Sequence, residues 1–216
     1  REAFLEKVFE WKDQYQSRIS NQMRRLGASF DFSREAFTMD ESRSAAVTEN
    51  FCKLFEDGIL YRENRLVNWC VYLNTTLSNL EVVQKTLPGR TLMNVPGYPP
   101  NERIEFGVIV SFVYPVVGSD EKIVVATTRP ETILGDTAVA VHPDDERYKH
   151  LHGKMLQHPF IPERQVPLVT DSIAVDMAFG TGAVKITPAH DPNDYDVGKR
   201  HNLPFINILN DDCLLY

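Results

Sequence analysis

The segment 180–194, with the sequence GTGAVKITPAHDPND, gathers side chains that could do chemistry together. Its centre, residues 183–187, reads as a short β-strand. Side chains alternate between the two faces of a strand. Lys185 and Thr187 are therefore predicted to share one face with Ala183, and the aliphatic Val184 and Ile186 to share the other. A proline then ends the strand, and three polar side chains can converge in the loop beyond it: His190, Asp191 and Asp194.

Two carboxylates three positions apart, Asp191 and Asp194, with Lys185 nearby, suit recognition of an ammonium group and a hydroxyl, or general acid and base catalysis. His190 is a candidate substrate-binding residue by its place in this loop, although a lone loop histidine is more often a hydrogen-bonded scaffold residue. The chain has no Gly-x-Ser-x-Gly elbow and no HExxH helix. Four more histidines lack carboxylates at a spacing that fixes a metal, so we expect surface residues and no metal site: His142, His150, His152 and His158.

A second polar loop follows the predicted strand 123–128. Threonines at the end of a strand offer hydroxyls, and the loop 129–136 can leave backbone N–H groups pointing at a ligand. Its arginine could also pair with Glu131 or Asp136 for structural reasons alone. Two polar loops at strand ends, each within apolar β-structure, predict a pocket at the mouth of a barrel. The candidate binding residues of this second loop are Thr127, Thr128, Arg129 and Thr132.

Composition is that of a soluble globular protein. The 216 residues are 43% hydrophobic and 25% charged, and no apolar run reaches membrane-spanning length. A net charge of -7 does not indicate a nucleic-acid binder, although a local basic patch remains open. Three cysteines without a CxxC spacing predict a reduced compartment and no zinc cluster.

The N-terminal part of the chain is predicted to be helix-rich. Apolar residues at helical spacing predict a helix over residues 1–26, with its stripe facing a core. A second helix is expected to start at Thr38 or at its rival N-cap Asp40 and to end at Gly58. Buried strands are expected at 59–61 and 66–72, as part of an α/β layer. The second helix should turn four residues inward: Val47, Phe51, Leu54 and Phe55.

Prolines and glycines between residues 86 and 103 mark the best domain boundary, which divides the chain into 1–83 and 84–216. The second part reads as mostly β, and several short strands at this density favour a closed or nearly closed barrel. Its predicted strands are 104–114, 123–128, 137–141, 165–170, 182–187 and 205–209. The predicted fold class is therefore α/β, with a helix-rich fragment followed by a barrel-like domain.

Two motifs resemble a known family. The run 126–132 (ATTRPET) is similar to the threonine-rich signature of the editing domain inserted in class I valyl-, isoleucyl- and leucyl-tRNA synthetases, and the run 180–194 looks like the valyl version. Segments 26–35, 37–40 and 66–69 resemble the valyl catalytic domain just before the insertion. The resemblance implies an internal fragment: part of the Rossmann-like catalytic domain, then an editing domain that is expected to be incomplete at its C-terminal end.

The resemblance also implies an activity, hydrolysis of threonine wrongly attached to tRNA(Val). Asp194 would bind the α-ammonium, and Asp191 with Lys185 and Thr187 would read the threonine hydroxyl. The threonines and the arginine of the second loop would hold the ester carbonyl, the terminal adenosine and the attacking water. The parent enzyme would ligate valine to tRNA(Val) with ATP and Mg²⁺, at a site outside this chain. Editing itself would need no cofactor.

Two other classes stay open at this point: a non-catalytic RNA-binding or assembly module, and a general hydrolase of small substrates. The expected partners are the 3′ end of tRNA(Val) and the threonine or valine that it carries, with no membrane. The oligomeric state is open. The expected compartment is the cytoplasm, with the mitochondrion as the alternative.

Overall fold

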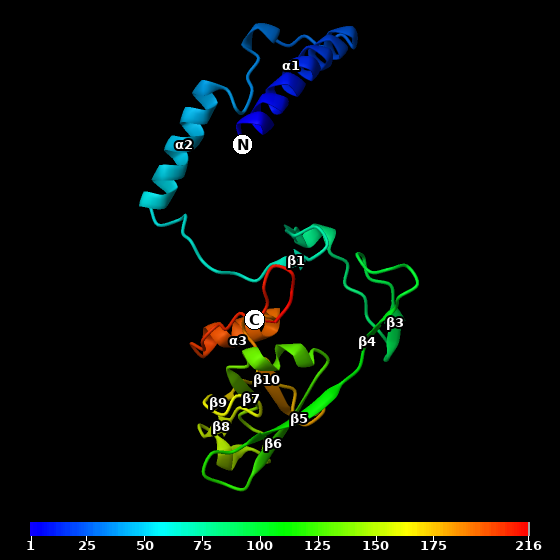
Figure 1. Cartoon of the computed structure of the whole chain (residues 1–216). Coiled ribbons are helices and arrows are strands. Elements are labelled where there is room, and N and C mark those ends of the chain that lie inside the picture. The colour runs from blue at the N-terminus through cyan, green and yellow to red at the C-terminus, as the bar shows by residue number, and fades with distance from the viewer. Residues whose placement is uncertain (216) are drawn as a thin grey trace. The chain divides into compact units, whose positions relative to one another are not determined.

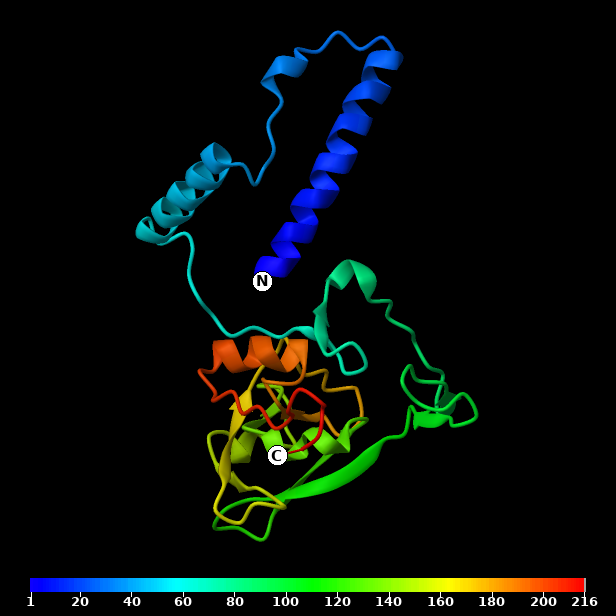
Figure 2. The same ribbon diagram turned by 45° about the horizontal axis from the view of Figure 1, so that its top comes forward.

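The computed structural model describes residues 1–215, and the chain divides into two compact units, Arg1–Glu63 and Asn64–Tyr216. The first unit consists of helices joined by a connecting segment, and the second consists of small sheets and a further α-helix (Figures 1 and 2). The mixed α/β class is thus confirmed. The predicted boundary between a catalytic segment and an editing domain, after residue 83, is a different division from that between these two units and stays a prediction. In the part of the chain that the structure describes, no helix is both long and apolar enough to cross a membrane.

The first unit contains helix α1 (Glu2–Arg25), a 3₁₀ turn (Phe32–Arg34) and helix α2 (Glu41–Glu56). Both predicted helices are confirmed. Asp40 is the N-cap of α2, since its carboxylate accepts a hydrogen bond from the backbone N–H of Arg43 at 2.9 Å. The alternative start at Thr38 is wrong.

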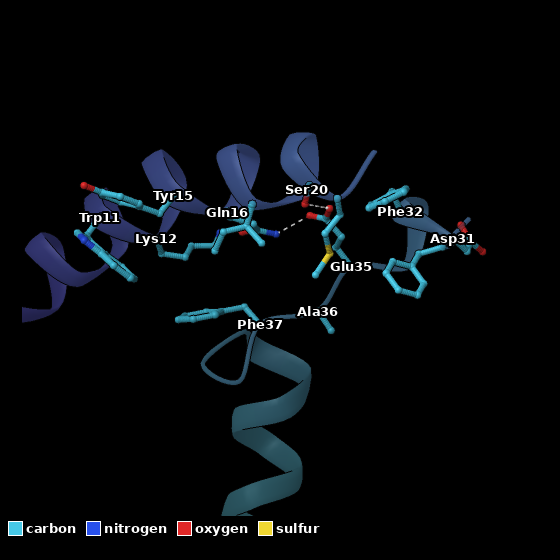
Figure 3. A pocket seen from close by; sticks show the side chains of 13 residues that line it. Trp11, Lys12, Tyr15, Gln16, Ser20, Asp31, Phe32, Glu35, Ala36 and Phe37 are labelled. Carbon is cyan, nitrogen blue, oxygen red and sulfur yellow. Dashed lines mark hydrogen bonds between the residues drawn. The ribbon is translucent and has the colours of Figure 1, made fainter. Parts of the chain in front are cut away.

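The apolar stripes of these helices do not face a core, which corrects the prediction. No residue of α1 or α2 is buried, and Trp11 and Phe51 are 61% and 58% exposed. Two helices offer too little surface to cover both stripes. The stripe of α1 instead borders a hollow of about 440 Å³ opposite Phe37 (Figure 3), and Glu35 ties the returning chain to α1 through Gln16 Nε2 and Ser20 Oγ, at 2.8 and 2.5 Å.

Short hairpins begin the second unit. Strands β1 (Asn68–Cys70) and β2 (Thr75–Leu77) pair antiparallel, as do β3 (Thr91–Met93) and β4 (Ile104–Phe106). No strand forms at 59–61, and only the middle of 66–72 is extended. The predicted strand 104–114 is interrupted, because Gly107 takes a φ of 78° against the backbone of Gly89.

The site is carried by a hairpin, a four-stranded sheet and a helix. Strands β5 (Val110–Pro115) and β6 (Lys122–Thr127) form the hairpin. The sheet has the order β10-β7-β9-β8, antiparallel except for the parallel pair β7 and β9. The predicted strands at 123–128, 137–141, 165–170 and 182–187 are confirmed, whereas 205–209 makes only the isolated bridge from Leu209 to Leu215. The remaining bounds are β7 (Ala138–Val141), β8 (Met155–Gln157), β9 (Gln165–Thr170), β10 (Ala183–Ile186) and α3 (Pro192–Arg200), with 3₁₀ turns at Asn79–Glu81, Pro130–Gly135 and Lys149–Leu151.

These strands approach a ring but do not close one. Strand β6 contacts β10, and a single bridge from Val116 to Leu156 links the end of β5 to β8. Hydrogen-bonded pairing is continuous only within the hairpin and within the four-stranded sheet, so the described strands form no closed barrel. The predicted barrel is therefore not confirmed.

The core lies on both faces of the four-stranded sheet. Successive residues of β7 alternate, with Val139 and Val141 in one apolar cluster and Ala138 and Ala140 in the other. The second cluster includes Val197 of α3, which packs against β10. The end of β10, the N-terminus of α3 and the end of β6 are thereby held close together (Figure 1).

Candidate functional site

A cavity of about 400 Å³ lies where β6, β10 and the N-terminus of α3 meet. Its wall contains every residue that the two polar loops predicted, from both segments of the sequence. Apolar residues and one amide complete the lining: Ile109, Ala126, Ala174, Phe179, Val184 and Asn193. The predicted site residues in the wall are Thr127, Thr128, Arg129, Thr132, Lys185, Thr187, His190, Asp191 and Asp194.

One wall of the cavity is the loop after β6. Thr127 Oγ1 accepts a hydrogen bond from the backbone N–H of Arg129 at 3.1 Å, which turns the chain sharply at the strand end. Thr132 is buried and donates to the carbonyl of Arg129 at 2.9 Å. The Arg129 side chain is half-exposed, pairs with Glu131 at 3.2 Å and does not pair with Asp136, the other partner considered. Its Nη1 donates to the carbonyl of His190 at 2.8 Å, so this contact joins the two loops.

Strand β10 supplies the opposite wall. Lys185 is 7% exposed and donates to Asp136 Oδ1 at 2.9 Å and to Thr187 Oγ1. Thr187, 1% exposed, donates its hydroxyl hydrogen to the same Asp136 oxygen at 2.5 Å. The shared strand face predicted for Lys185 and Thr187 is confirmed. A buried lysine is tolerated here because a buried carboxylate lies beside it.

Asp191 and Asp194 begin helix α3. Asp191 is its N-cap, and Oδ1 accepts from the backbone N–H groups of Asn193 and Asp194 at 2.8 and 3.2 Å. Asp194 Oδ2 accepts from the N–H of Thr187 at 2.8 Å. Burial raises the pKa of Asp194 from 3.8 to about 6, the Thr187 N–H opposes the shift, and the charge of Asp191 adds to it. Part of Asp194 is therefore protonated near neutral pH, and a nearby cation would favour its charged form.

His190 forms a hydrogen bond within the scaffold, which is one of the two roles considered for it. Its Nε2 accepts from the backbone N–H of Ile208 at 3.1 Å, so this nitrogen carries a lone pair. Burial and then the positive charges of Arg129 and Lys185 lower the pKa of His190, which keeps the ring neutral near pH 7. The ring borders the cavity without making a cationic site.

The sequence did not predict two residues that are hydrogen-bonded behind Lys185 and Thr187. Asp136 is fully buried and Tyr114 OH donates to its Oδ2 at 2.5 Å. The sequence suggests Asp136 only as a partner for Arg129. The available signal was its position at the end of the threonine-rich loop, after Gly135, beside a predicted strand. Tyr114 carried no signal beyond its place in an alternating apolar run.

The histidines between residues 142 and 158 do not form a cluster, but one of them corrects the prediction of surface positions. His158 is 1% exposed and its Nε2 lies 2.9 Å from the carbonyl of Ile133. Burial lowers the pKa of His158. Within residues 1–215, no group of three or more histidine, cysteine, aspartate or glutamate side chains could hold a metal ion. The three cysteines are free thiols.

Such a cavity suits a ligand with a cationic end and a hydroxyl. The carboxylate of Asp194 lies beside Thr187, from whose backbone N–H it accepts a hydrogen bond at 2.8 Å, and the Thr187 hydroxyl and the Lys185 ammonium group line the same cavity. The exposed Thr128 and Arg129 border the opening, where an anionic or carbonyl group can be met by hydrogen-bond donors.

Comparison with known proteins gives one consistent family. The family model for tRNA synthetases class I (I, L, M and V) matches residues 1–178. Mitochondrial valine-tRNA ligase of Saccharomyces cerevisiae is 66% identical over 215 residues, and valine-tRNA ligase of Schizosaccharomyces pombe is also 66% identical; both matches cover 100% of this chain. Human valine-tRNA ligase is 59% identical over 97% of the chain. The chain spans only 19%, 22% and 16% of these relatives' lengths.

Among solved structures, a ternary complex of an Agrobacterium radiobacter LeuRS with tRNA and LeuAMS matches 93% of this chain and 32% of its own, at 18% identity and a TM-score of 0.40. GlLeuRS-CP1 matches 36% of this chain and 44% of its own, at 22% identity and a TM-score of 0.31. The family model and the valyl relatives, which cover nearly the whole sequence, carry the assignment. The chain therefore belongs to the class I tRNA synthetases of the I, L, M and V group, and it is similar to valine-tRNA ligases along its entire length.

Proposed function

We propose that the cavity hydrolyses the ester of threonyl-tRNA(Val), as the editing site of a protein that ligates valine to tRNA(Val) with ATP and Mg²⁺. The observation that carries this proposal is that all nine predicted residues line one cavity of about 400 Å³. The valyl identity of the relatives supplies the substrate class. An aliphatic pocket sized for valine is known to reject threonine by only about 10²-fold, so a second, hydroxyl-reading site is needed.

In this proposal the ammonium group of the threonyl ester lies against Asp194. A cation at that position stabilises the ionised carboxylate and offsets the burial that raises its pKa. The threonine hydroxyl meets Lys185 and Thr187, with Asp191 adding negative charge at the rim while its Oδ1 caps α3. Valine offers no hydroxyl to the remaining N–H of Lys185 and the remaining lone pair of Thr187, which disfavours its ester by about 1–3 kcal/mol.

The chemical step is direct attack by water. A water oxygen adds to the ester carbonyl, the bond from the carbonyl carbon to the ribose oxygen breaks, and one water proton ends on that ribose oxygen. The products are free threonine and tRNA with its terminal hydroxyl restored. Thr127, Thr128, Arg129 and Thr132 lie where they can hold the carbonyl, the terminal adenosine and the water. The ribose's own neighbouring hydroxyl can help to orient the water.

The test is a deacylation assay with threonyl-tRNA(Val) and the full-length protein. Asp194→Ala and Lys185→Ala should each lower the hydrolysis rate at least tenfold. Asp196→Ala is the matched control, because Asp196 is exposed on the same helix and does not border the cavity. Wild-type rates in both site variants would reject the assignment. Binding of tRNA without hydrolysis by the wild-type protein would instead favour a non-catalytic RNA-binding or assembly module.

The proposed partners are the 3′ end of tRNA(Val) and the aminoacyl group that it carries. The relatives include enzymes named as mitochondrial, from Saccharomyces cerevisiae and Arabidopsis thaliana, and others without that label. We therefore propose the cytoplasm or the mitochondrion as the compartment.

A further inference from the structure

Behind the cavity wall, a fully buried carboxylate accepts hydrogen bonds from three side chains. Asp136 Oδ1 receives Lys185 Nζ at 2.9 Å and Thr187 Oγ1 at 2.5 Å, and Oδ2 receives Tyr114 OH at 2.5 Å. Asp136 does not border the cavity itself, whereas Lys185 and Thr187 do. Any influence of Asp136 on a ligand therefore passes through these two side chains.

The direction of these hydrogen bonds restricts what the cavity can offer. An ionised carboxylate only accepts, so the single hydroxyl hydrogen of Thr187 is committed to Asp136. One lone pair of Thr187 Oγ1 receives Lys185, which leaves the other lone pair as an acceptor. The lysine ammonium has three N–H bonds, of which two point to Asp136 and Thr187. The pair thus presents one acceptor and one donor.

A hydroxyl group is one donor and one acceptor, and a methyl group is neither. We propose that Asp136 is a positioning residue that fixes the hydrogen-bond polarity of Thr187 and Lys185, so that the cavity accepts a side-chain hydroxyl and rejects an isosteric methyl. This inference rests on the proposed function. It adds a residue that fixes which group donates and which accepts, so that the cavity distinguishes threonyl from valyl esters by hydrogen-bond direction as well as by shape.

Tyr114 holds the carboxylate from the other side. The tyrosine is fully buried in the apolar cluster around β5, β7 and β9, and its ring cannot turn away without opening that cluster. Burial and then the negative charge of Asp136 raise the pKa of Tyr114 well above its usual value, so the phenol keeps its proton and remains a donor. With both oxygens engaged, the carboxylate has one orientation, and so do its partners on β10.

The experiment compares hydrolysis of threonyl-tRNA(Val) and valyl-tRNA(Val) by the full-length protein and its variants. Asp136→Asn keeps the shape but places a donor among donors, and Tyr114→Phe removes one hydroxyl without changing the packing. The control is Asp145→Asn, a buried carboxylate 5% exposed that pairs with Arg147 away from the cavity. Circular dichroism and thermal unfolding establish that each variant is folded.

We expect Asp136→Asn to lower the threonyl-over-valyl ratio of kcat/KM at least tenfold, which corresponds to about 1.4 kcal/mol. Tyr114→Phe should lower it less, about threefold, because Lys185 and Thr187 still donate to the Asp136 carboxylate after this one hydrogen bond is lost. The change should lie in KM for the threonyl ester with kcat unchanged, because the hydroxyl is held equally before and during the reaction. A merely structural role would slow both esters alike, which is the pattern expected of Asp145→Asn.

A wild-type ratio in folded Asp136→Asn would overturn the inference. If that variant does not fold, Tyr114→Phe decides in its place, and a wild-type ratio there has the same meaning. A wild-type protein that hydrolyses neither ester would reject the proposed function itself, so the two failures are distinguishable.

Discussion

Replacing Asp194 by asparagine should stabilise the folded site at neutral pH while removing its ability to bind a cation. Burial raises the pKa of the Asp194 carboxyl from 3.8 to about 6. When folding raises the pKa of a carboxyl, the folded state binds the proton more tightly than the unfolded state does. The free energy of unfolding is therefore highest below the pKa of the unfolded state, and this advantage is lost as pH rises through the pKa of the folded state. Near pH 7.5 the native state therefore carries the penalty of a buried charge.

The size of that penalty follows from the shift. About two pKa units at 1.36 kcal/mol each give about 3 kcal/mol well above pH 6, falling to about 0.5 kcal/mol near pH 4. Asparagine has no charge to bury, and its Oδ1 can still accept the Thr187 N–H that Asp194 accepts at 2.8 Å. The Asn variant should therefore exceed the wild type in local stability by up to about 3 kcal/mol near neutral pH, with the difference closing on acidification.

Hydrogen exchange of the full-length protein measures this directly, because peptides spanning β10 and α3 report local opening. Protection in Asp194→Asn should exceed the wild type near pH 7.5 and match it near pH 4. Asp196→Asn, exposed on the same helix, should behave as the wild type at both. Equal or lower protection in Asp194→Asn at neutral pH would refute the reasoning. The same variant should lose about 10-fold to 100-fold in threonyl-tRNA(Val) hydrolysis, since a charged hydrogen bond is worth about 1.5–3 kcal/mol.

Other outcomes follow from the same geometry. In the proposed reaction, kcat/KM for the threonyl ester should fall on acidification with an apparent pKa near 6, as Asp194 of the free protein takes up a proton; a kcat/KM that is flat down to about pH 5 would contradict this. Lys185→Met should lower the local stability of β10 by about 3–5 kcal/mol, because it leaves the Asp136 charge buried and unpaired, and hydrogen exchange of the same peptides checks it. Gly198→Ala should lower the unfolding temperature, since an added Cβ would lie 2.7 Å from Pro188 Cβ, and overpacking of this kind removes about 1–3 kcal/mol; an unchanged unfolding temperature would contradict it.

The candidate site could be predicted from the sequence because its residues fall in two short runs. Alternation along β10 placed Lys185 and Thr187 on one face, and polar residues at strand ends indicated two walls of a pocket. The buried partner was not predictable in this way. Asp136 lies 49 positions from Lys185, and no local pattern connects a carboxylate at a loop end with a lysine in a distant strand. Its role as a three-way acceptor depends on tertiary packing alone.

The fold was predictable where one periodic segment makes one element, as in α1 and β9. Prediction was wrong where burial or strand continuity depends on which other part of the chain packs against the segment. An apolar stripe predicts a face that can be buried, but the described first unit has too little surface to bury it, so Trp11 and Phe51 stay exposed. The break at Gly107 likewise depends on the backbone of Gly89 lying close by, which no alternation pattern reveals.

The two walls of the cavity also set when during folding the site can appear. Contacts that hold the walls, including those to the buried Asp136, join residues that are 49, 51 and 61 positions apart, and the strands behind them include the parallel pair β7 and β9. Loop-closure entropy must be lost before such contacts form, so long-range pairings of this kind form slowly. A chain folded only as far as the β5 and β6 hairpin has one wall and no pocket. The proposed hydrolytic activity should therefore emerge only when the sheet is assembled, and the rate of its recovery on refolding would report that step.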